Sequence, residues 1–191
     1  MTSPRGHAYR WMKLQAMACL LFGRDARAEV LFGQMLARWP GDGYALASRA
    51  HVRAAAGRPA EAIADLQALV LAQPTRSAGD WFNLAFLLER AERLEEAEVA
   101  FRRAVALDDK LDRAWYGLGL VLIRRGQPDE AVAALKRNTE LQPMSPYGWY
   151  QLARVHVDRQ NADEARRIIR HLKGFEPKVA AQLERETGLA A

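Results

Sequence analysis

An alanine recurs along the chain at a nearly constant interval. Its successive copies lie 34, 35, 34 and 34 residues apart, and three tryptophans repeat the 34-residue step: Ala28, Ala62, Ala97, Ala131 and Ala165, and Trp81, Trp115 and Trp149. A fixed interval of this size is typical of one supersecondary unit stacked several times. This period constrains the fold more than any other feature, because each unit must bury its apolar face against its neighbours.

Composition permits a folded, non-membrane chain. Half of the residues are hydrophobic and 27% are charged, which favours a packed core over disorder. No apolar stretch approaches the roughly 20 residues that span a bilayer, so no membrane insertion is expected. The apolar run around Cys19 is too short and too interrupted for a signal peptide and is interpreted as a helix. With one cysteine and no disulfide framework, a cytoplasmic location is predicted.

Within each repeat, two apolar stripes at helical spacing flank a polar break. With the recurring alanine at position 20, position 8 is always small and position 24 is always large and apolar. Glycine in this break ends the first helix. Each unit is therefore predicted to be a helix–turn–helix hairpin, with units at 9–42, 43–76, 78–111, 112–145 and 146–179.

The two ends of the chain fall outside these five units. Residues 1–8 are predicted to be an N-terminal extension. Residues 180–191 are predicted to hold a capping helix, starting near Lys178 and ending at Gly188, followed by a short tail. A terminal repeat needs such a helix to shield its last apolar face. The predicted fold class is all-α.

The fourth unit carries a specific signature. Trp115, Leu118 and Gly119, followed by Ala131, Leu135 and Pro143, resemble the tetratricopeptide repeat. The third and fifth units are similar, through Trp81, Leu84, Ala85, Ala97 and Phe101, and through Trp149, Leu152, Ala153, Ala165 and Pro177. The first two units depart from the pattern at position 7, where Gln15 and Arg49 replace leucine. The resemblance implies an α-solenoid of about five repeats and a role in protein–protein interaction.

No catalytic or metal-binding constellation is present in the sequence. The four histidines form no ligand pattern with one another or with Cys19, and there is no glycine-rich phosphate loop. His156 lies on a core-facing stripe and is predicted to be a hydrogen-bonded packing residue. We therefore expect a non-enzymatic protein with no cofactor, no metal and no catalytic residue.

The resemblance also implies that the first helix of each unit lines a concave, partner-binding face. The inward positions carry aromatic and apolar side chains outside the structural stripes, with arginines beside them. This pattern indicates a partner segment that is acidic as well as apolar. The predicted partner-binding residues are Lys13, Met17, Tyr44, His51, Phe82, Phe86, Arg90, Arg113, Tyr116, Leu120, Arg124, Tyr147, Tyr150 and Arg154.

The function favoured by this pattern is a scaffold or adaptor that binds a protein segment and supports assembly of a larger complex. A chaperone that holds a client protein is the alternative. Nucleic-acid binding is suggested by the net charge of +5 and by arginines beside aromatic rings, but acidic residues interrupt the groove and disfavour it. A catalytic subunit is the least favoured interpretation.

The first predicted helix is apolar nearly all round. Trp11, Leu14, Leu21 and Phe22 form a possible second interface, because a terminal helix exposes one of its sides. Residues 1–8, a second copy of the chain or a partner protein are the candidates to cover it. Self-association through the first helix is thus left open.

Overall fold

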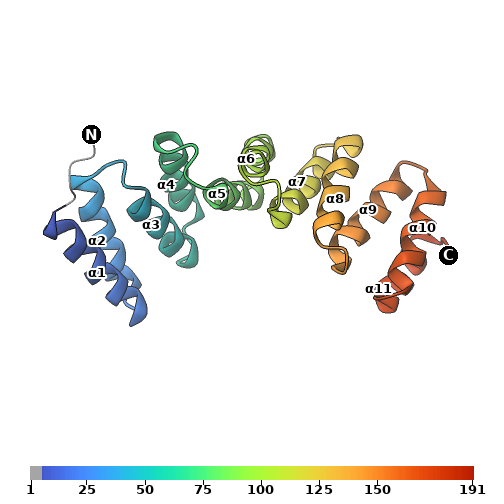
Figure 1. The fold of residues 1–191 in the computed structure, drawn as a ribbon, viewed down its shortest axis with the longest axis horizontal. Coiled ribbons are helices and arrows are strands. Elements are labelled where there is room, and N and C mark those ends of the chain that lie inside the picture. The colour runs from blue at the N-terminus through green and yellow to red at the C-terminus, as the bar shows by residue number, and fades with distance from the viewer. Residues whose placement is uncertain (1–5) are drawn as a thin grey trace. The chain divides into compact units, whose positions relative to one another are not determined.

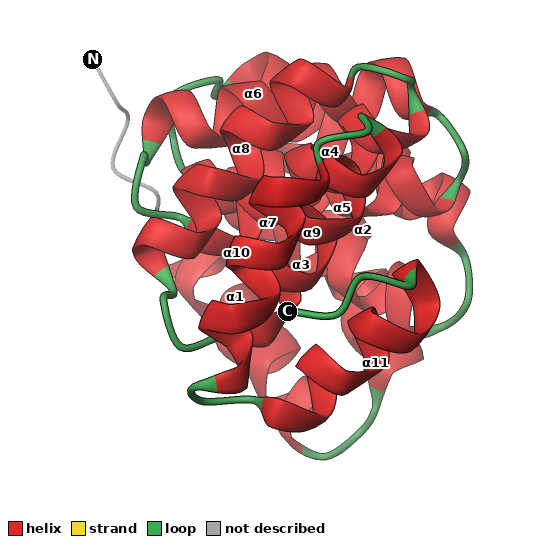
Figure 2. Ribbon diagram, turned by 90° about the vertical axis from the view of Figure 1, so that its right-hand side faces the viewer, coloured by secondary structure: helices red, strands yellow, loops and turns green. Residues whose placement is uncertain are grey.

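The computed structural model describes residues 6–191, and these fold entirely into α-helices joined by short loops (Figures 1 and 2). Within this range there are eleven helices and no strand, as the sequence predicts. The chain divides into two compact units, Met1–Ala91 and Glu92–Ala191. The helices are α1 His7–Leu21, α2 Asp25–Arg38, α3 Gly43–Ala55, α4 Pro59–Ala72, α5 Ala78–Arg90, α6 Leu94–Leu107, α7 Asp112–Arg124, α8 Pro128–Leu141, α9 Pro146–Asp158, α10 Ala162–Lys173 and α11 Pro177–Thr187.

The first unit is built from two hairpins and a following helix. Helices α1 and α2 pack together, as do α3 and α4, and each second helix packs against the first helix that follows it: α2 on α3 and α4 on α5. The helices α3 and α5 begin at residues 43 and 78, the first residues of the second and third predicted repeats. Helix α1 begins at His7, so two residues of the predicted extension belong to it.

The second unit repeats this arrangement. Helix α6 packs on α7, the hairpins α7/α8 and α9/α10 follow, and α11 packs against both α9 and α10. Its core near the C-terminus includes Leu152, Ile169 and Leu172, and α11 adds Ala180 and Leu183 to the same cluster. Helix α11 thus covers the apolar side of the last hairpin. It ends at Thr187 and is followed by Gly188, whose left-handed backbone (φ +70°) favours glycine.

The periodic small residues lie where helices approach closely. All five recurring alanines have no exposed surface. Position 24 is buried in every repeat, from Phe32 to Ile169. At position 8 of the fourth repeat, a Cβ added to Gly119 would come within 2.7 Å of the Leu135 side chain. The burial of the periodic small and large residues agrees with their predicted place in the core, and in the fourth repeat Gly119 lies against Leu135.

The turn between the two helices of a hairpin requires a left-handed residue. Gly23, Gly57 and Gly126 adopt φ between +66° and +74° there. Glu92 and Gln160 adopt nearly the same conformation, at +60° and +59°, without being glycine. Non-glycine residues pay a steric cost in this region. Two turns therefore keep the same left-handed conformation although they lack the glycine found in the other three.

The periodic tryptophans fasten each first helix to the loop before it. The indole N–H groups of Trp81, Trp115 and Trp149 donate hydrogen bonds of 2.8–2.9 Å to backbone carbonyl oxygens six or seven residues earlier. The acceptors are Pro74, Asp109 and Pro143. A tryptophan at this place therefore fills space with its ring and also satisfies a loop carbonyl.

Arg49 stands where the repeat pattern has leucine, and the structure gives it an ionic partner instead. Its Nε and Nη2 atoms donate to the two carboxylate oxygens of Asp65, at 2.9 and 2.6 Å. Arg53 also donates to Asp65, at 3.0 Å, and to Glu29, at 2.9 Å. Hydrogen bonds from Arg58 and then Arg53 lower the pKa of Glu29 to about 2. These ion pairs link α2, α3 and α4.

We predict that Asp65→Ala destabilises the protein by about 3 kcal/mol, because it leaves two arginines without their shared, buried carboxylate. The Asp65 side chain is only 5% exposed. The matched control is Glu61→Ala on the same helix, whose side chain is 46% exposed and whose loss should cost less than about 1 kcal/mol. Urea unfolding followed by circular dichroism measures both. Equal decreases in the free energy of unfolding for the two variants would contradict a particular role of Asp65.

His156 corrects one expectation from the sequence. It is buried in the core, as predicted, but neither of its ring nitrogens has a hydrogen-bond partner. Burial is the main cause that lowers its pKa below the ordinary histidine value near 6.5. The charges of Lys136 and Arg159 also lower the pKa, whereas Glu164 raises it. The imidazole therefore packs as a neutral ring.

Stability should fall as the pH drops below about 6.5, because the unfolded chain protonates His156 more readily than the folded chain does. Above that pH the neutral ring carries no penalty, and the slope below it approaches about 1.4 kcal/mol per pH unit. Glu29 responds only under more acidic conditions, since its pKa lies near 2 and its ordinary value is 4.5. His156→Leu should remove this slope, whereas His51→Gln, at an exposed position, should keep it. Urea unfolding between about pH 7 and pH 5 measures the slope.

Candidate functional site

Two neighbouring hollows lie on the face of the second unit that its first helices line. The first has a volume of about 430 Å³ and the second about 300 Å³. Tyr116 of α7 and Tyr147 of α9 line both. The remaining lining residues are Asp112, Arg113, Asn138, Gln142 and Ser145 in the first hollow, and Pro146, Tyr150, Gln151, Val179 and Gln182 in the second.

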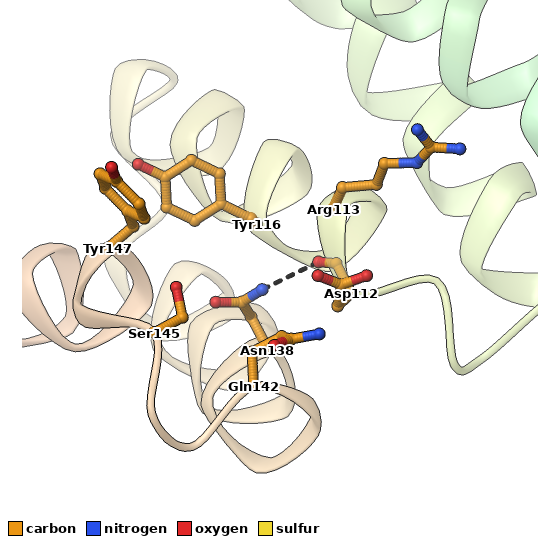
Figure 3. A pocket seen from close by; sticks show the side chains of 7 residues that line it. All are labelled: Asp112, Arg113, Tyr116, Asn138, Gln142, Ser145 and Tyr147. Carbon is orange, nitrogen blue, oxygen red and sulfur yellow. Dashed lines mark hydrogen bonds between the residues drawn. The ribbon is translucent and has the colours of Figure 1, made fainter.

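Tyr147 is the most exposed ring at this site. Its side chain stands on the first turn of α9, directly after Pro146, and 70% of its surface is accessible. Figure 3 shows the rings of Tyr147 and Tyr116 beside each other, while Arg113 extends away from them. Exposed tyrosine supplies contact area and a hydroxyl at a low entropic cost. The two rings form a ridge shared by both hollows.

The floor of the first hollow is held in place by a buried amide. The Asn138 side chain donates a hydrogen bond of 2.9 Å to the backbone oxygen of Asp112, which joins α8 to the start of α7 (Figure 3). Its Oδ1 atom lies so close to Gly148 that a Cβ there would collide with it. Glycine at 148 therefore lets α9 approach α8 and fixes the position of Tyr147 one residue earlier.

Helix α11 forms part of the wall of the second hollow. Glu186 accepts a hydrogen bond of 2.6 Å from the Tyr150 hydroxyl and one of 2.7 Å from Gln182. These two donors, Tyr150 first, lower the pKa of Glu186. Arg154 lies over the Tyr150 ring, 5.9 Å from its centroid. Tyr150 is therefore half-buried against α11, and Glu186 is hydrogen-bonded to two of the residues that line the second hollow.

The first unit has a smaller hollow between α3 and α5. Its volume is about 230 Å³, and it is lined by Ala47, Ala50, His51, Ala54, Leu66, Asn83, Phe86 and Leu87. Phe82 stacks on Phe86 with ring centroids 6.3 Å apart, and Arg90 lies 5.7 Å from the centre of the Phe86 ring. Lys13 lies 4.0 Å from the centre of the Tyr44 ring. Cation and ring pairs recur along this face.

None of the predicted partner-binding residues is buried within the described structure. The structure brings six of them into the hollows: His51 and Phe86 in the first unit, and Arg113, Tyr116, Tyr147 and Tyr150 in the second. The others line no hollow described here. Met17 and Leu120 are accessible side chains, and Arg124 forms an ion pair with Glu92.

Sequence reasoning missed the polar lining of the second unit. Gln142 and Ser145 lie at the loop between α8 and α9, and Gln182 lies on α11. The sequence predicts α11 as a capping helix only, whereas the structure gives it a second role. It packs on α9 and α10 as α9 packs on α7 and α8, so it acts as the first helix of a further hairpin and adds to the same face.

The predicted second interface is exposed. Trp11, Leu14, Leu21 and Phe22 are between 58% and 81% accessible. The prediction that residues 1–8 cover them falls mostly outside the described residues, since residues 1–5 are not described and His7 and Ala8 belong to α1. The remaining described residue, Gly6, is itself exposed.

Residues 6–191 contain neither a metal-binding cluster nor a membrane-crossing helix. No three side chains of His, Cys, Asp or Glu gather in a way that would hold a metal ion. None of the helices in this range combines the length and the hydropathy that crossing a bilayer requires.

Solved structures share this arrangement of helix hairpins. MamA protein aligns with a TM-score of 0.82 and 21% identity, over 96% of this chain and 97% of the other. YrrB, described as a tetratricopeptide protein with an unusual peptide-binding site, aligns with a TM-score of 0.80 and 19% identity, over 89% and 88%. A tetratricopeptide repeat protein from Parabacteroides merdae aligns with a TM-score of 0.80 and 19% identity, over 96% and 75%.

The fold class is thus an α-solenoid of helix–turn–helix repeats. The family model described as tetratricopeptide repeat matches residues 47–112, and the model for subunit 3 of the anaphase-promoting complex, or cyclosome, matches residues 91–172. The chain is a tetratricopeptide repeat protein. Comparison with curated protein sequences gives no match. Proteins of this class typically act as non-catalytic modules that bind other proteins.

We predict that Tyr150→Phe loosens α11, because it removes the hydroxyl that donates to Glu186. The cost should be about 1 kcal/mol, with faster hydrogen exchange confined to α11 and its contacts with α9. Tyr147→Phe is the matched control, since the Tyr147 ring stands exposed at the start of α9. Hydrogen-exchange mass spectrometry compares the two variants. Unchanged exchange in α11 after Tyr150→Phe would contradict a role for this bond.

Proposed function

We propose that the chain is a non-catalytic scaffold that binds a segment of a partner protein on its first-helix face and supports assembly of a larger complex. The observation that carries the proposal is the pair of hollows that share Tyr116 and Tyr147. Two accessible rings between two hollows suit a bound peptide that places one side chain in each hollow. A cytoplasmic location is part of the same proposal.

The polar groups of this face support an extended peptide as the ligand. Gln142, Gln151 and Gln182 lie at the rims of the two hollows. Amide side chains both donate and accept hydrogen bonds, so they can satisfy the backbone of a bound segment without selecting one charge. The apolar rings would take its side chains.

The charges of the site set the expected composition of the partner. Arg113 lines the first hollow and Arg154 lies beside the second, which favours a carboxylate on the ligand. Glu186 accepts a hydrogen bond from Tyr150 beside the second hollow, so a ligand carboxylate is less favoured there. We therefore propose a partner segment that is apolar near Tyr150 and acidic near Arg113.

Ion pairing inside the protein argues against nucleic acid as the main ligand. Arg93, Arg102, Arg125, Arg137 and Arg159 of the second unit all pair with carboxylates of this chain. Cations that are already paired release few counterions from a phosphate backbone. Binding to single-stranded DNA should therefore be weak and should vanish at moderate salt.

A client-holding chaperone remains the second candidate, favoured by the apolar residues exposed on α1. The two roles differ in stoichiometry and in effect. A chaperone keeps an aggregation-prone client soluble, so the protein should suppress light scattering of a denatured test protein such as citrate synthase. A scaffold with a sequence-selective groove should leave that aggregation unchanged.

We predict that peptides selected from a random phage-displayed library bind the wild-type protein and lose at least about tenfold in affinity for Tyr147→Ala, because half of the shared ridge is removed. Tyr116→Ala should have the same effect. The matched control is Tyr9→Ala, a tyrosine buried in α1 and remote from both hollows in sequence and unit, which should leave affinity unchanged if the chain stays folded. Fluorescence anisotropy with labelled peptides measures binding. Failure to select any peptide, or peptides insensitive to both substitutions, would refute the proposed site.

A further inference from the structure

The outward face of α1 is a continuous apolar stripe. Trp11, Leu14, Ala18, Leu21 and Phe22 follow one another at spacings of three, four, three and one residues, which places them within about 100° around the helix. The opposite side of α1 carries the buried residues Tyr9, Ala16 and Cys19, which face the body of the unit. Contiguous exposed apolar surface of this kind marks an interaction site.

The same positions are covered in the inner repeats. Trp11 occupies position 3, and its counterparts in α3, α5, α7 and α9 are Ala45, Asp80, Ala114 and Gly148, all buried. In each case the preceding second helix packs on the first helix: α2 on α3, α4 on α5, α6 on α7 and α8 on α9. None of these four residues is an aromatic residue, and a Cβ added at Gly148 would already collide with Asn138.

Trp11 therefore excludes the packing that the inner repeats use. A helix seated on α1 in the way that α2 sits on α3 would collide with its indole ring. The occupant of this face must accept a bulky ring that projects outward, together with Leu21 and Phe22 at the end of the helix. A fluid apolar environment accommodates a projecting ring better than a closely packed helix does.

Three arginines lie close to this stripe along the chain. Arg10 lies one turn before Leu14 along α1, and Arg24 and Arg27 follow Phe22 at the tip of the hairpin. None of the three forms an ion pair within residues 6–191. Helix α1 has no acidic residue, and Asp25 is the one carboxylate between Gly6 and Ala28. The excess of positive charge near this face therefore favours an anionic binding partner.

We propose that this face, which comprises Trp11, Leu14, Leu21 and Phe22 with Arg10, Arg24 and Arg27, binds peripherally to the surface of an anionic lipid bilayer. The apolar side chains would enter the boundary between headgroups and acyl chains, and the arginines would contact lipid phosphates. Tryptophan, phenylalanine and leucine flanked by arginine are the composition of helices that lie in a membrane interface. No helix needs to cross the bilayer.

A second copy of the chain fits this face less well. Two α1 stripes in contact would bring the arginines of both copies together without carboxylates to offset them. The proposal is also independent of the peptide site, since it rests on α1 and on the turn that follows it. Loss of peptide binding and loss of lipid binding are therefore separate outcomes.

The test is co-sedimentation of the full chain with vesicles of phosphatidylcholine, with or without phosphatidylglycerol. We expect binding to the mixed vesicles that weakens with salt, and little binding to phosphatidylcholine alone. The double variant Leu14→Glu and Leu21→Glu should lose at least about tenfold in partitioning. Arg10→Gln should lose roughly fivefold, the share of one cation near an anionic surface.

The matched control is Leu71→Glu, because Leu71 is 86% exposed on α4, away from this face, and it should bind vesicles as the wild type does. Far-UV circular dichroism verifies that each variant is folded. Absence of binding to mixed vesicles would overturn the proposal, as would equal loss in the control. Sedimentation velocity provides a further check: a dimer that Leu21→Glu dissociates would assign the face to a second copy instead.

Discussion

Close approach between neighbouring helices is the constraint on which the rest of this structure depends. It requires a small residue at defined places in every repeat, and the fully buried alanines from Ala28 to Ala165 satisfy it. Gly119 and Gly148 mark two places where even one added methyl group would meet a side chain of the neighbouring helix. Because packed interiors tolerate little change in volume, the period in the sequence follows from this geometry.

The same constraint determines which residues are available for binding. In the third to fifth repeats, positions 3, 7, 8 and 11 of the first helix are buried, and the tryptophan at position 4 is bonded to the preceding loop. Positions 2 and 5 are not committed in this way. Tyr116 and Tyr147 occupy such positions, and their rings are accessible although they belong to helices with well-packed cores. The Asn138–Gly148 contact links the two roles, since it holds α9 against α8 and thereby sets the place of Tyr147.

The sequence predicted the helices and their packing faces because these depend on local periodicity. It could not predict which side chains pair across helices. Arg49 breaks the apolar pattern, yet Asp65 compensates for it from the next helix, and no spacing rule identifies such a partner. His156 fits the core pattern by position and size, but its missing hydrogen bonds become visible only when the surrounding side chains are placed. The contact of Tyr150 with Glu186 likewise depends on how α11 docks on α9.

Position 3 connects the internal packing of the array with the exposed face of α1. In α3, α7 and α9 a small residue at this position admits the preceding helix, whereas in α1 the same position carries a tryptophan that would block it. The change is accompanied by Leu21 and Phe22 at the end of the helix, where the inner repeats have alanine, arginine or aspartate. A bulky ring is therefore tolerated at this position of α1, because this side of the helix is exposed within residues 6–191.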